Sequence, residues 1–340
     1  MQEYPSTSPA PIIQVQPASN NRLPLWILLS VFVGFMLPVC SCAVLGLGFA
    51  SSLSLFGDGT TSSGGLGDAI AIVRVEGTIT SGDDTDVSTD ATSGTVIADL
   101  RAANDDPTVK AIVLRVDSPG GSVTGSAQIY EVMREMDKPV IVSMAGVAAS
   151  GGYYVSAPAD YIFARPDTTT GSIGVILTLF NAQELIDEIG VDVIAITSGP
   201  NKALGSFWEE ITPEQQAIFE EALNEAYDDF VQVIVDGRNL EPAAVRELAD
   251  GRTYTGRQAL KLGLVDELGN FQDAIAKAAE MGGISGEPRL VEFEHLPGLQ
   301  QLLSGFSTRL NQTPGDQALS LMSELAIPAI EYRYVGPASQ

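Results

Sequence analysis

The stretch AGVAASGGYY, residues 145–154, decides how the middle of this chain folds. The apolar run just before it, residues 140–142, predicts a buried strand. After that run the side chains become very small, and glycine and alanine surround the single hydroxyl of Ser150. Such residues let a chain turn sharply from a strand into a helix. Either two backbones pack closely at this turn, or a molecule from outside must approach Ser150.

Strands and helices alternate along the chain on both sides of this turn. Apolar, β-branched runs predict strands over residues 69–77, 111–118, 139–145, 161–165, 191–197 and 289–293. Helical spacing of apolar residues predicts helices over residues 95–104, 122–136, 150–156, 183–189, 240–249, 256–262 and 271–281. A further helix begins after Thr212, with Pro213 at its first position and Gln215 where a capping box requires it. The pattern indicates an α/β domain, in which helices cover a sheet.

The N-terminal part of the chain has a different composition. Residues 1–22 are rich in Pro, Ser, Asn and Gln and predict a disordered tail. Residues 23–50 carry no charge, and as a helix they would span roughly 42 Å, more than the ~30 Å of bilayer hydrocarbon. They therefore predict one transmembrane helix. Residues 51–68 are rich in Gly, Ser and Thr and predict a flexible linker.

The charges around the predicted span favour an N-terminus inside the cell, because Arg22 precedes the span and the next basic residue is Arg74. We therefore expect a single-pass protein of the cell membrane, in contact with lipid, whose main domain lies outside the cytoplasm. Both cysteines, Cys40 and Cys42, fall within the span. The alternative is a cleaved signal that is lipidated at Cys42, although the long polar lead argues against it.

Composition limits what the remaining residues can do. The chain has 340 residues, of which 45% are hydrophobic, so a sizeable core can form over residues 69–295. The net charge is −25, and the whole excess of acidic residues lies in residues 58–340. Such a domain would repel a phosphate backbone, which makes nucleic acid an unlikely partner. Residues 296–340 are weakly patterned, and the sequence leaves the structure of this C-terminal segment open.

Histidine and cysteine chemistry is almost absent from the predicted domain, whose one histidine is His295. The sequence therefore predicts no metal site of the usual kinds and no cofactor. It also lacks a phosphate-binding loop and a dinucleotide fingerprint. Nothing near His295 suggests a catalytic role, so a nucleophilic serine would need a different base.

Ser150 is a candidate nucleophile because it follows a strand and opens a helix, which sets its hydroxyl on a tight turn. Its small neighbours let a substrate backbone come close. A second turn of this kind occurs in DSPGGSV, residues 117–123. Acyl transfer needs two backbone N–H donors at one point, and Gly121 and Gly151 are the candidates for this oxyanion hole. Each stretch taken alone is equally compatible with an ordinary close-packed turn.

The candidate base is a lysine. Lysine can accept a proton from serine if desolvation keeps its amine uncharged near neutral pH. Of the five lysines, Lys202 alone lies among small and apolar residues, in TSGPNKALGSFW; the others are Lys110, Lys138, Lys261 and Lys277. Ser172, on the glycine-flanked turn TGSIGV, could orient a neutral lysine. By itself, Lys202 is as compatible with an ordinary surface loop.

These motifs, in this order, resemble the signal peptide peptidase A (protease IV) family of membrane-bound bacterial serine peptidases. The resemblance covers residues 69–280 and is carried by the stretches DSPGGSV, AASGGYYVSAPAD, TGSIGV, SGPNKALGS and GRTYTGRQALKLGLVDELG. It implies a Clp-protease/crotonase-like fold of ββα units. It also implies that Ser150 is the nucleophile, Lys202 the general base and Ser172 the hydroxyl beside the lysine, with Gly121 and Gly151 as oxyanion donors.

The resemblance further implies peptide substrates, such as signal peptides left in the membrane, and a groove for small or aliphatic side chains. Short family members form homo-oligomeric rings in which neighbouring subunits supply serine and lysine. Many relatives have an acidic residue after the lysine and a proline after the later serine, where this chain has Ala203 and Phe207. These departures bear on the shape of the groove more than on the Ser-Lys dyad.

Two other functions remain compatible with the sequence. One is a crotonase-like acyl-CoA enzyme, which would use the same oxyanion hole with glutamates for proton transfer. A membrane anchor outside the cytoplasm argues against it, because coenzyme A is scarce there. The other is a membrane scaffold that keeps the fold and has lost the chemistry. Proximity of Ser150 and Lys202, within or between subunits, would separate the peptidase from both.

Overall fold

A computed structural model describes residues 67–82, 90–293 and 329–336, all within one compact unit, Gly59–Gln340. The predicted tail (1–22), the predicted membrane span (23–50) and His295 lie outside the described residues, as does the predicted linker (51–68) except for its last two residues. Within the described part of the chain, no helix combines the length and the apolar character needed to cross a bilayer.

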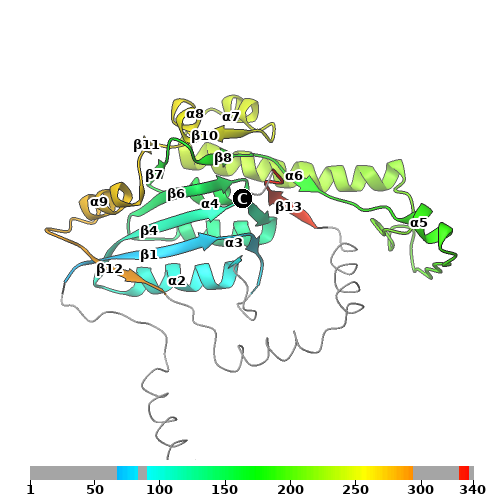
Figure 1. Cartoon of the computed structure of the whole chain (residues 1–340), viewed down its shortest axis with the longest axis horizontal. Coiled ribbons are helices and arrows are strands. Elements are labelled where there is room, and N and C mark those ends of the chain that lie inside the picture. Colours follow the sequence, from blue (N-terminus) through cyan, green and yellow to red (C-terminus); the bar gives the residue numbers. More distant parts are fainter. Residues whose placement is uncertain (1–66, 83–89, 294–328, 337–340) are drawn as a thin grey trace, which may run out of the picture. The chain divides into compact units, whose positions relative to one another are not determined.

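The main sheet has eight strands and is largely parallel (Figure 1). Its order is β10-β8-β6-β4-β1-β12, with β7 beside the first part of β6 and β11 beside β7. β10 is antiparallel to its neighbour β8. The strands are β1 (Ala69–Glu76), β4 (Val109–Ser118), β6 (Val140–Ala149), β7 (Tyr161–Ala164), β8 (Thr169–Gly171), β10 (Thr253–Thr255), β11 (Glu267–Leu268) and β12 (Arg289–Glu292).

A second sheet of five short strands adjoins the end of β4. Its order is β3-β2-β5-β13-β9, and β13 is antiparallel to both of its neighbours. The chain passes from β4 into β5 at Pro119, so the two sheets meet at this turn. The strands are β2 (Ile79–Thr80), β3 (Ala91–Thr92), β5 (Gly120–Ser122), β9 (Ile176–Leu177) and β13 (Ile330–Arg333).

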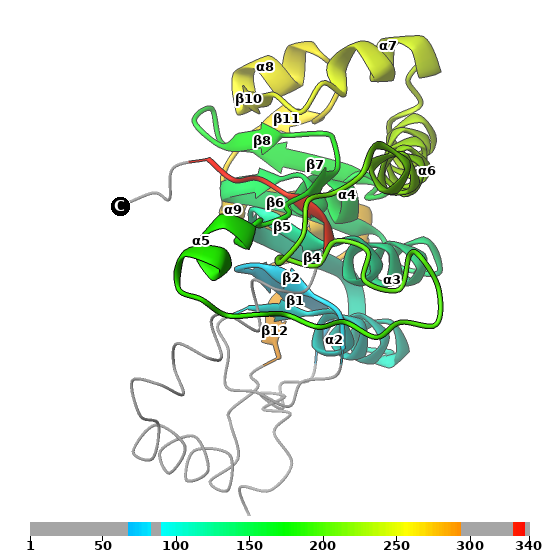
Figure 2. The same ribbon diagram turned by 90° about the vertical axis from the view of Figure 1, so that its right-hand side faces the viewer.

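Helices cover both faces of the main sheet, and this explains why its strands are apolar throughout. Alternate residues of β1 point to opposite faces: Ala71 and Val73 join one buried cluster, and Ile70 and Ile72 join the other. The first cluster includes α2 (Ser93–Asp105), α3 (Val123–Arg134), α4 (Gly151–Ser156) and the end of α6 (Pro213–Arg238). The second contains α9 (Phe271–Met281), on the opposite face (Figure 2).

Most predicted elements are present in the structure. Five of the six predicted strands form, as β1, β4, β6, β7 and β12. The predicted helices form as α2, α3, α4, α5 (Gln183–Glu188), α6, α7 (Pro242–Leu248), α8 (Gly256–Lys261) and α9. The capping box at the start of α6 is confirmed, because Thr212 and Gln215 exchange side-chain and backbone hydrogen bonds. The α/β class predicted from sequence is therefore confirmed.

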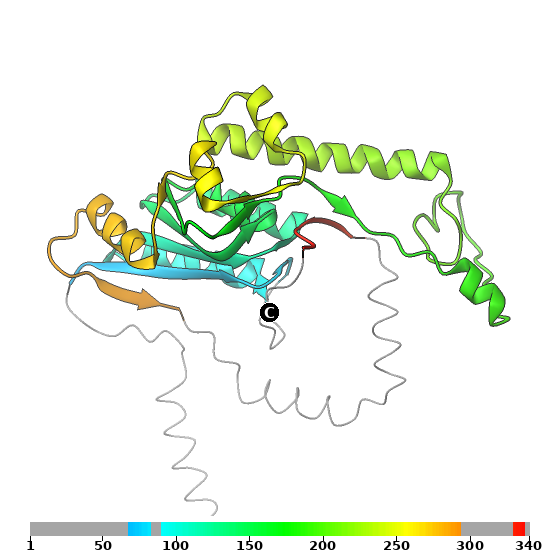
Figure 3. The ribbon, with the colours of Figure 1, turned by 45° about the horizontal axis from the view of Figure 1, so that its top comes forward.

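The predicted strand at residues 191–197 is wrong. These residues form no ladder in the structure, and Ile194 and Ile196 are 84% and 95% exposed. A β-branched run becomes a strand only where a neighbouring strand and a packing surface are present. This run lies in a segment that connects β9 to α6, residues 178–212, which we call the arm. The arm extends away from the main sheet (Figures 1 and 3), and within residues 67–82, 90–293 and 329–336 the run has no pairing partner.

Candidate active site

Ser150 lies where β6 ends and α4 begins, and its backbone has a strained conformation. Its φ is 52° and its ψ is −117°, a combination that a residue with a side chain rarely adopts. Three hydrogen bonds hold it there. The Ser150 N–H donates to the Gly171 carbonyl at 2.7 Å, and the Ser150 carbonyl accepts from the N–H groups of Tyr153 and Tyr154 at 2.9 and 2.8 Å. The surrounding structure therefore fixes this residue in a conformation that packing alone does not require.

The Ser150 side chain does not serve the helix that it precedes. Serine at the start of a helix usually accepts a hydrogen bond from a backbone N–H of the first turn. Ser150 makes no such capping bond, although Ser122 does so at the start of α3, where it accepts from Gly125. Ser150 itself is buried. Its hydroxyl is therefore left available for another purpose, as expected of a nucleophile.

The glycines around Ser150 allow very close backbone approach. A Cβ added to Gly151 would lie 2.6 Å from the Ser126 hydroxyl oxygen and 3.1 Å from the Gly120 Cα. One added to Gly120 would lie 2.5 Å from the Gly151 nitrogen. The close packing of two backbones, which the sequence offered as one reason for the small residues around Ser150, is therefore present in the structure. It also brings β5 and the start of α4 together, so the N–H groups of Gly121 and Gly151 come from adjoining segments.

Ser172 also lies beside this turn. It follows Gly171, whose carbonyl holds the Ser150 N–H, and it is buried with a φ of 50°. Its N–H donates to the Arg252 carbonyl at 2.9 Å. Two threonines attach β8, the strand that ends at Gly171, to β6. The hydroxyls of Thr168 and Thr170 donate to the Ala145 and Ala148 carbonyls. The structure therefore brings together Ser150, Ser172, Gly121 and Gly151, the four site residues outside the arm.

Lys202 is not brought to Ser150 within one chain. It lies in the exposed arm, and its backbone forms a turn from Asn201 to Gly205. The arm leads into α6, whose core residues Phe230 and Ile234 lie near its far end. The start of α6 is thus about 25 Å along the helix from Phe230. A single chain therefore holds the candidate nucleophile and the candidate oxyanion donors together, and the candidate base Lys202 lies away from them.

Two other lysines, Lys138 and Lys110, form hydrogen bonds at the end of the main sheet opposite to Ser150. Lys138 precedes β6 and donates to the carbonyls of Ala103 and Asp106, and burial lowers its pKa. Lys110 lies at the start of β4 and donates to the Pro107 carbonyl. β6 is ten residues long, so its two ends are roughly 30 Å apart. Neither amine can therefore deprotonate Ser150 of the same chain.

One residue important to this site, Tyr332, carried no recognised signal in the sequence. Gly120, which the motif DSPGGSV places beside Gly121, has a φ of 92° and a contact with Gly151 that exclude larger residues. Tyr332, in the weakly patterned C-terminal segment, pairs across the ladder with Gly121. The aromatic alternation IEYRY around Tyr332 could have indicated a strand.

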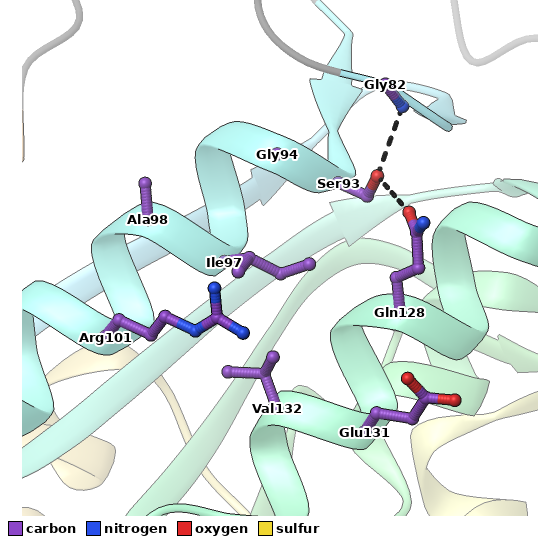
Figure 4. Close-up of a pocket in the computed structure, with 9 residues that line it drawn as sticks. All are labelled: Gly82, Ser93, Gly94, Ile97, Ala98, Arg101, Gln128, Glu131 and Val132. Carbon is purple, nitrogen blue, oxygen red and sulfur yellow. Dashed lines mark hydrogen bonds between the residues drawn. The ribbon is translucent and has the colours of Figure 1, made fainter.

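Two cavities of about the same volume lie in different parts of the described structure. A cavity of about 400 Å³ lies between α2 and α3 (Figure 4), and none of the predicted site residues line it. In its lining, the Ser93 hydroxyl donates to Gln128 and accepts from the Gly82 N–H. A second cavity, of about 390 Å³, borders Ser172 and Gly174 on one side and Arg333 on the other. The second is therefore the one connected to the candidate active site.

Comparison with known proteins agrees with this geometry. Residues 133–285 match the model of peptidase family S49, and residues 75–170 match the Clp protease model. A Synechocystis protein that carries a provisional protease name is 39% identical over 236 residues, which cover 68% of this chain and 82% of that protein. This chain belongs to peptidase family S49. It is a serine peptidase of this family, whose members include proteins named protease 4 and signal peptide peptidase.

Other S49 relatives match this chain over only part of their own length. Protease 4 of Salmonella typhi is 40% identical over 220 residues, 63% of this chain and 35% of that protein. An Enterococcus faecium protein, provisionally named a signal peptide peptidase, is 42% identical over 182 residues, 53% of each chain. This chain therefore spans about a third to a half of these two relatives. The S49 match includes Ser150, Ser172 and Lys202, and the Clp match includes Gly121 and Ser150.

Proposed function

We propose that this protein is a membrane-anchored serine endopeptidase that uses a Ser-Lys dyad, Ser150 and Lys202, to hydrolyse apolar peptides such as cleaved signal peptides. The observation that carries the proposal is the backbone of Ser150. A non-glycine residue is held at positive φ by three hydrogen bonds, and its hydroxyl is withheld from helix capping. Strain of this kind is kept where the surrounding structure fixes a functional group.

The chemistry follows from the groups at this turn. Lys202, with its amine uncharged, takes the proton of Ser150, and the alkoxide attacks the peptide carbonyl. The N–H groups of Gly121 and Gly151 stabilise the oxyanion of the tetrahedral intermediate. The ammonium of Lys202 then protonates the leaving amine, and water hydrolyses the acyl-enzyme with the same lysine as base.

The dyad would form between two copies of the chain. Eight large apolar side chains of the arm are at least 38% exposed; they are Phe180, Leu185, Ile189, Val191, Val193, Ile194, Ile196 and Ile211. An exposed apolar surface of this extent is typical of an interface. Docking of the arm on a neighbour would bury it and remove the Lys202 amine from water, which favours the uncharged form that a base needs. A homo-oligomeric ring satisfies this for every subunit at once.

Anchoring and location rest on the sequence outside the described residues. The uncharged run of residues 23–50 supports a single membrane-spanning helix, and Arg22 supports a cytoplasmic N-terminus. The catalytic domain would then lie outside the cytoplasm, close to the membrane in which apolar peptide remnants collect.

The test is peptide hydrolysis by the chain without residues 1–57, compared with its Ser150→Ala and Lys202→Ala variants. We expect both substitutions to abolish cleavage while circular dichroism shows an unchanged fold. Covalent labelling of Ser150 by a serine-directed reagent should be lost in both variants, since Lys202 activates the hydroxyl. Turnover that persists in purified Ser150→Ala protein would refute the proposal.

A further inference from the structure

A second serine hydroxyl lies buried near Ser150 and has no partner in the described structure. Ser126 is near the start of α3 and is completely buried. Its hydroxyl oxygen makes no hydrogen bond with any residue that the structure describes. A buried polar group without a partner costs folding free energy, so natural proteins contain few of them. Such a hydroxyl is therefore expected to receive its partner from outside the chain.

The usual partner of a helical serine is not used by Ser126. A serine within a helix commonly donates to the carbonyl four residues before it. Ser156 does so in α4, where its hydroxyl donates to the Gly152 carbonyl at 2.6 Å. The corresponding carbonyl for Ser126 is that of Ser122, and no such bond forms in the part of the chain that the structure describes. The Ser126 hydroxyl therefore does not serve its own helix.

The Ser126 oxygen lies against Gly151 instead. A Cβ built on Gly151 would be 2.6 Å from this oxygen, which is closer than real Cβ atoms come to other atoms. Gly151 is the first residue of α4 and directly follows the candidate nucleophile Ser150. A larger residue at this position would fill the space between the start of α4 and the Ser126 hydroxyl. The glycine therefore leaves that space open.

This open space is on the side of Gly151 where an oxyanion would form. The first N–H groups of a helix have no partner within the helix, and Gly151 supplies one of them in α4. At helical backbone angles, the N–H bond and the Cα–Cβ direction lie on the same side of the N–Cα bond. An oxygen that accepts from Gly151 at ~2.9 Å would lie about 3.5 Å from the Cβ position. The Ser126 oxygen is 2.6 Å from that position, so the two oxygens would be neighbours.

The passage from β5 into α3 holds Ser126 in place relative to Gly121. Gly121 lies in β5, and Ser126 follows in α3. Ser122 caps this helix by accepting from the Gly125 N–H at 3.1 Å. Gly125 packs closely on the second sheet, since a Cβ built on it would lie 2.9 Å from the Thr80 carbonyl oxygen. These contacts fix the first turn of α3 beside the candidate oxyanion hole.

We propose that the Ser126 hydroxyl is a third oxyanion donor, which acts with the N–H groups of Gly121 and Gly151 when Ser150 attacks a peptide carbonyl. This inference deepens the proposed peptidase function and rests on it. The hydroxyl is unpaired in the free enzyme and gains its partner when the carbonyl oxygen becomes negative. An interaction that strengthens as this charge develops raises kcat more than it raises the affinity for substrate.

The first experiment measures peptide hydrolysis by the full chain and its Ser126→Ala variant. We expect kcat to fall at least about a hundredfold and KM to stay within about threefold, as for the loss of one oxyanion donor. The urea midpoint of unfolding should be unchanged or higher, because alanine removes an unpaired polar group.

The matched control for this variant is Ser143→Ala. It also removes a completely enclosed serine hydroxyl, which lies in the middle of β6 and accepts from Arg115. Its kcat should stay within about threefold of wild type, because this hydroxyl is remote from the reacting carbonyl.

The second experiment separates the oxyanion from the rest of the bound peptide. A peptide aldehyde of apolar sequence adds reversibly to the Ser150 hydroxyl, and the former carbonyl oxygen then occupies the oxyanion hole. The matching peptide alcohol binds without forming this bond. We expect Ser126→Ala to weaken inhibition by the aldehyde about a hundredfold and inhibition by the alcohol less than about threefold. Equal weakening of both would show that Ser126 shapes the groove, and it would overturn the inference.

The outcomes also separate this inference from the proposed function. If wild type hydrolyses peptides and Ser150→Ala does not, but Ser126→Ala keeps kcat within about threefold of wild type, the inference is overturned and the peptidase stands. If Ser126→Ala is unfolded by circular dichroism, the hydroxyl serves the fold, and the inference again fails. Hydrolysis that survives Ser150→Ala overturns the peptidase and this inference with it.

Discussion

The turn that carries Ser150 and the arm that carries Lys202 differ in almost every physical respect. The first is enclosed by two sheets and two helices, and its residues from Ala148 to Ser156 are all buried. The arm exposes most of its apolar side chains, and Ile196 is 95% exposed. The first keeps a strained backbone in place by hydrogen bonds, while the second leaves a β-branched run without a ladder.

The difference teaches that the two halves of the proposed dyad have different requirements. A nucleophile and its oxyanion donors must be held to within a fraction of an ångström, which only a close-packed core provides. The amine of a lysine base must be removed from water to stay uncharged, and the arm can achieve this by docking on another subunit. Four predictions follow from this contrast between the turn and the arm, and the first has the largest expected effect.

Mixing two inactive variants should restore activity if the dyad forms between subunits. Ser150→Ala and Lys202→Ala should each lower kcat/KM by at least about a thousandfold, since the two residues act as one unit. Random co-assembly of equal amounts should then recover about a quarter of the wild-type rate, because one site in four pairs an intact serine with an intact neighbouring lysine. The measurement is peptide hydrolysis after co-refolding. A mixture as inactive as its components would place the dyad within one chain or abolish it.

Polar substitutions in the arm should affect assembly without affecting the fold. Ile194→Ser with Ile196→Ser removes the two most exposed apolar side chains of the arm. We expect activity to fall about a hundredfold or more as subunits separate, because apolar contact drives association. Unfolding of the isolated domain should shift by no more than about 0.5 kcal/mol per substitution. Sedimentation velocity and urea titration measure the two effects, and an unchanged assembly would show that the arm is not an interface.

Two glycine substitutions compare the tolerance of the two regions directly. Gly120→Ala adds a methyl group against Gly151 at a φ of 92°, and we expect it to cost about 2–4 kcal/mol of unfolding free energy. Gly199→Ala in the arm has open space around its Cβ position and should cost less than about 0.5 kcal/mol. Urea denaturation of both variants is the measurement. Equal costs would contradict the view that only one region is close-packed.

The smallest effect concerns alkaline pH at the edge of the main sheet. Burial, assisted by a hydrogen bond to Glu267, raises the pKa of Tyr161 to about 12. Because this folded-state pKa lies above that of an unfolded tyrosine, the stabilisation is complete below about pH 10 and is lost as pH rises through 12. The Tyr161→Phe variant should therefore show a flatter fall of stability between pH 10 and 12. An identical pH profile for the two proteins would contradict this assignment.

Several of these features could be predicted from the sequence because they depend on neighbours along the chain. The apolar runs of β1, β4 and β6, the capping box of α6 and the small residues around Ser150 are local signals. The strand expected at residues 191–197 does not form because a strand needs a pairing partner, and none is present in the part of the chain that the structure describes. β13 was missed for the converse reason, since its four residues become a strand only between β5 and β9.

The sequence by itself determined the α/β class, the family resemblance and the identity of a serine on a tight turn, because these follow from local pattern and residue chemistry. Only the tertiary structure decided that Ser150 has a left-handed backbone, that Lys202 lies away from Ser150 of its own chain, and that Tyr332 is buried and pairs with Gly121. These three facts depend on contacts between residues far apart in the chain, such as Gly121 with Tyr332, and such contacts exist only after folding.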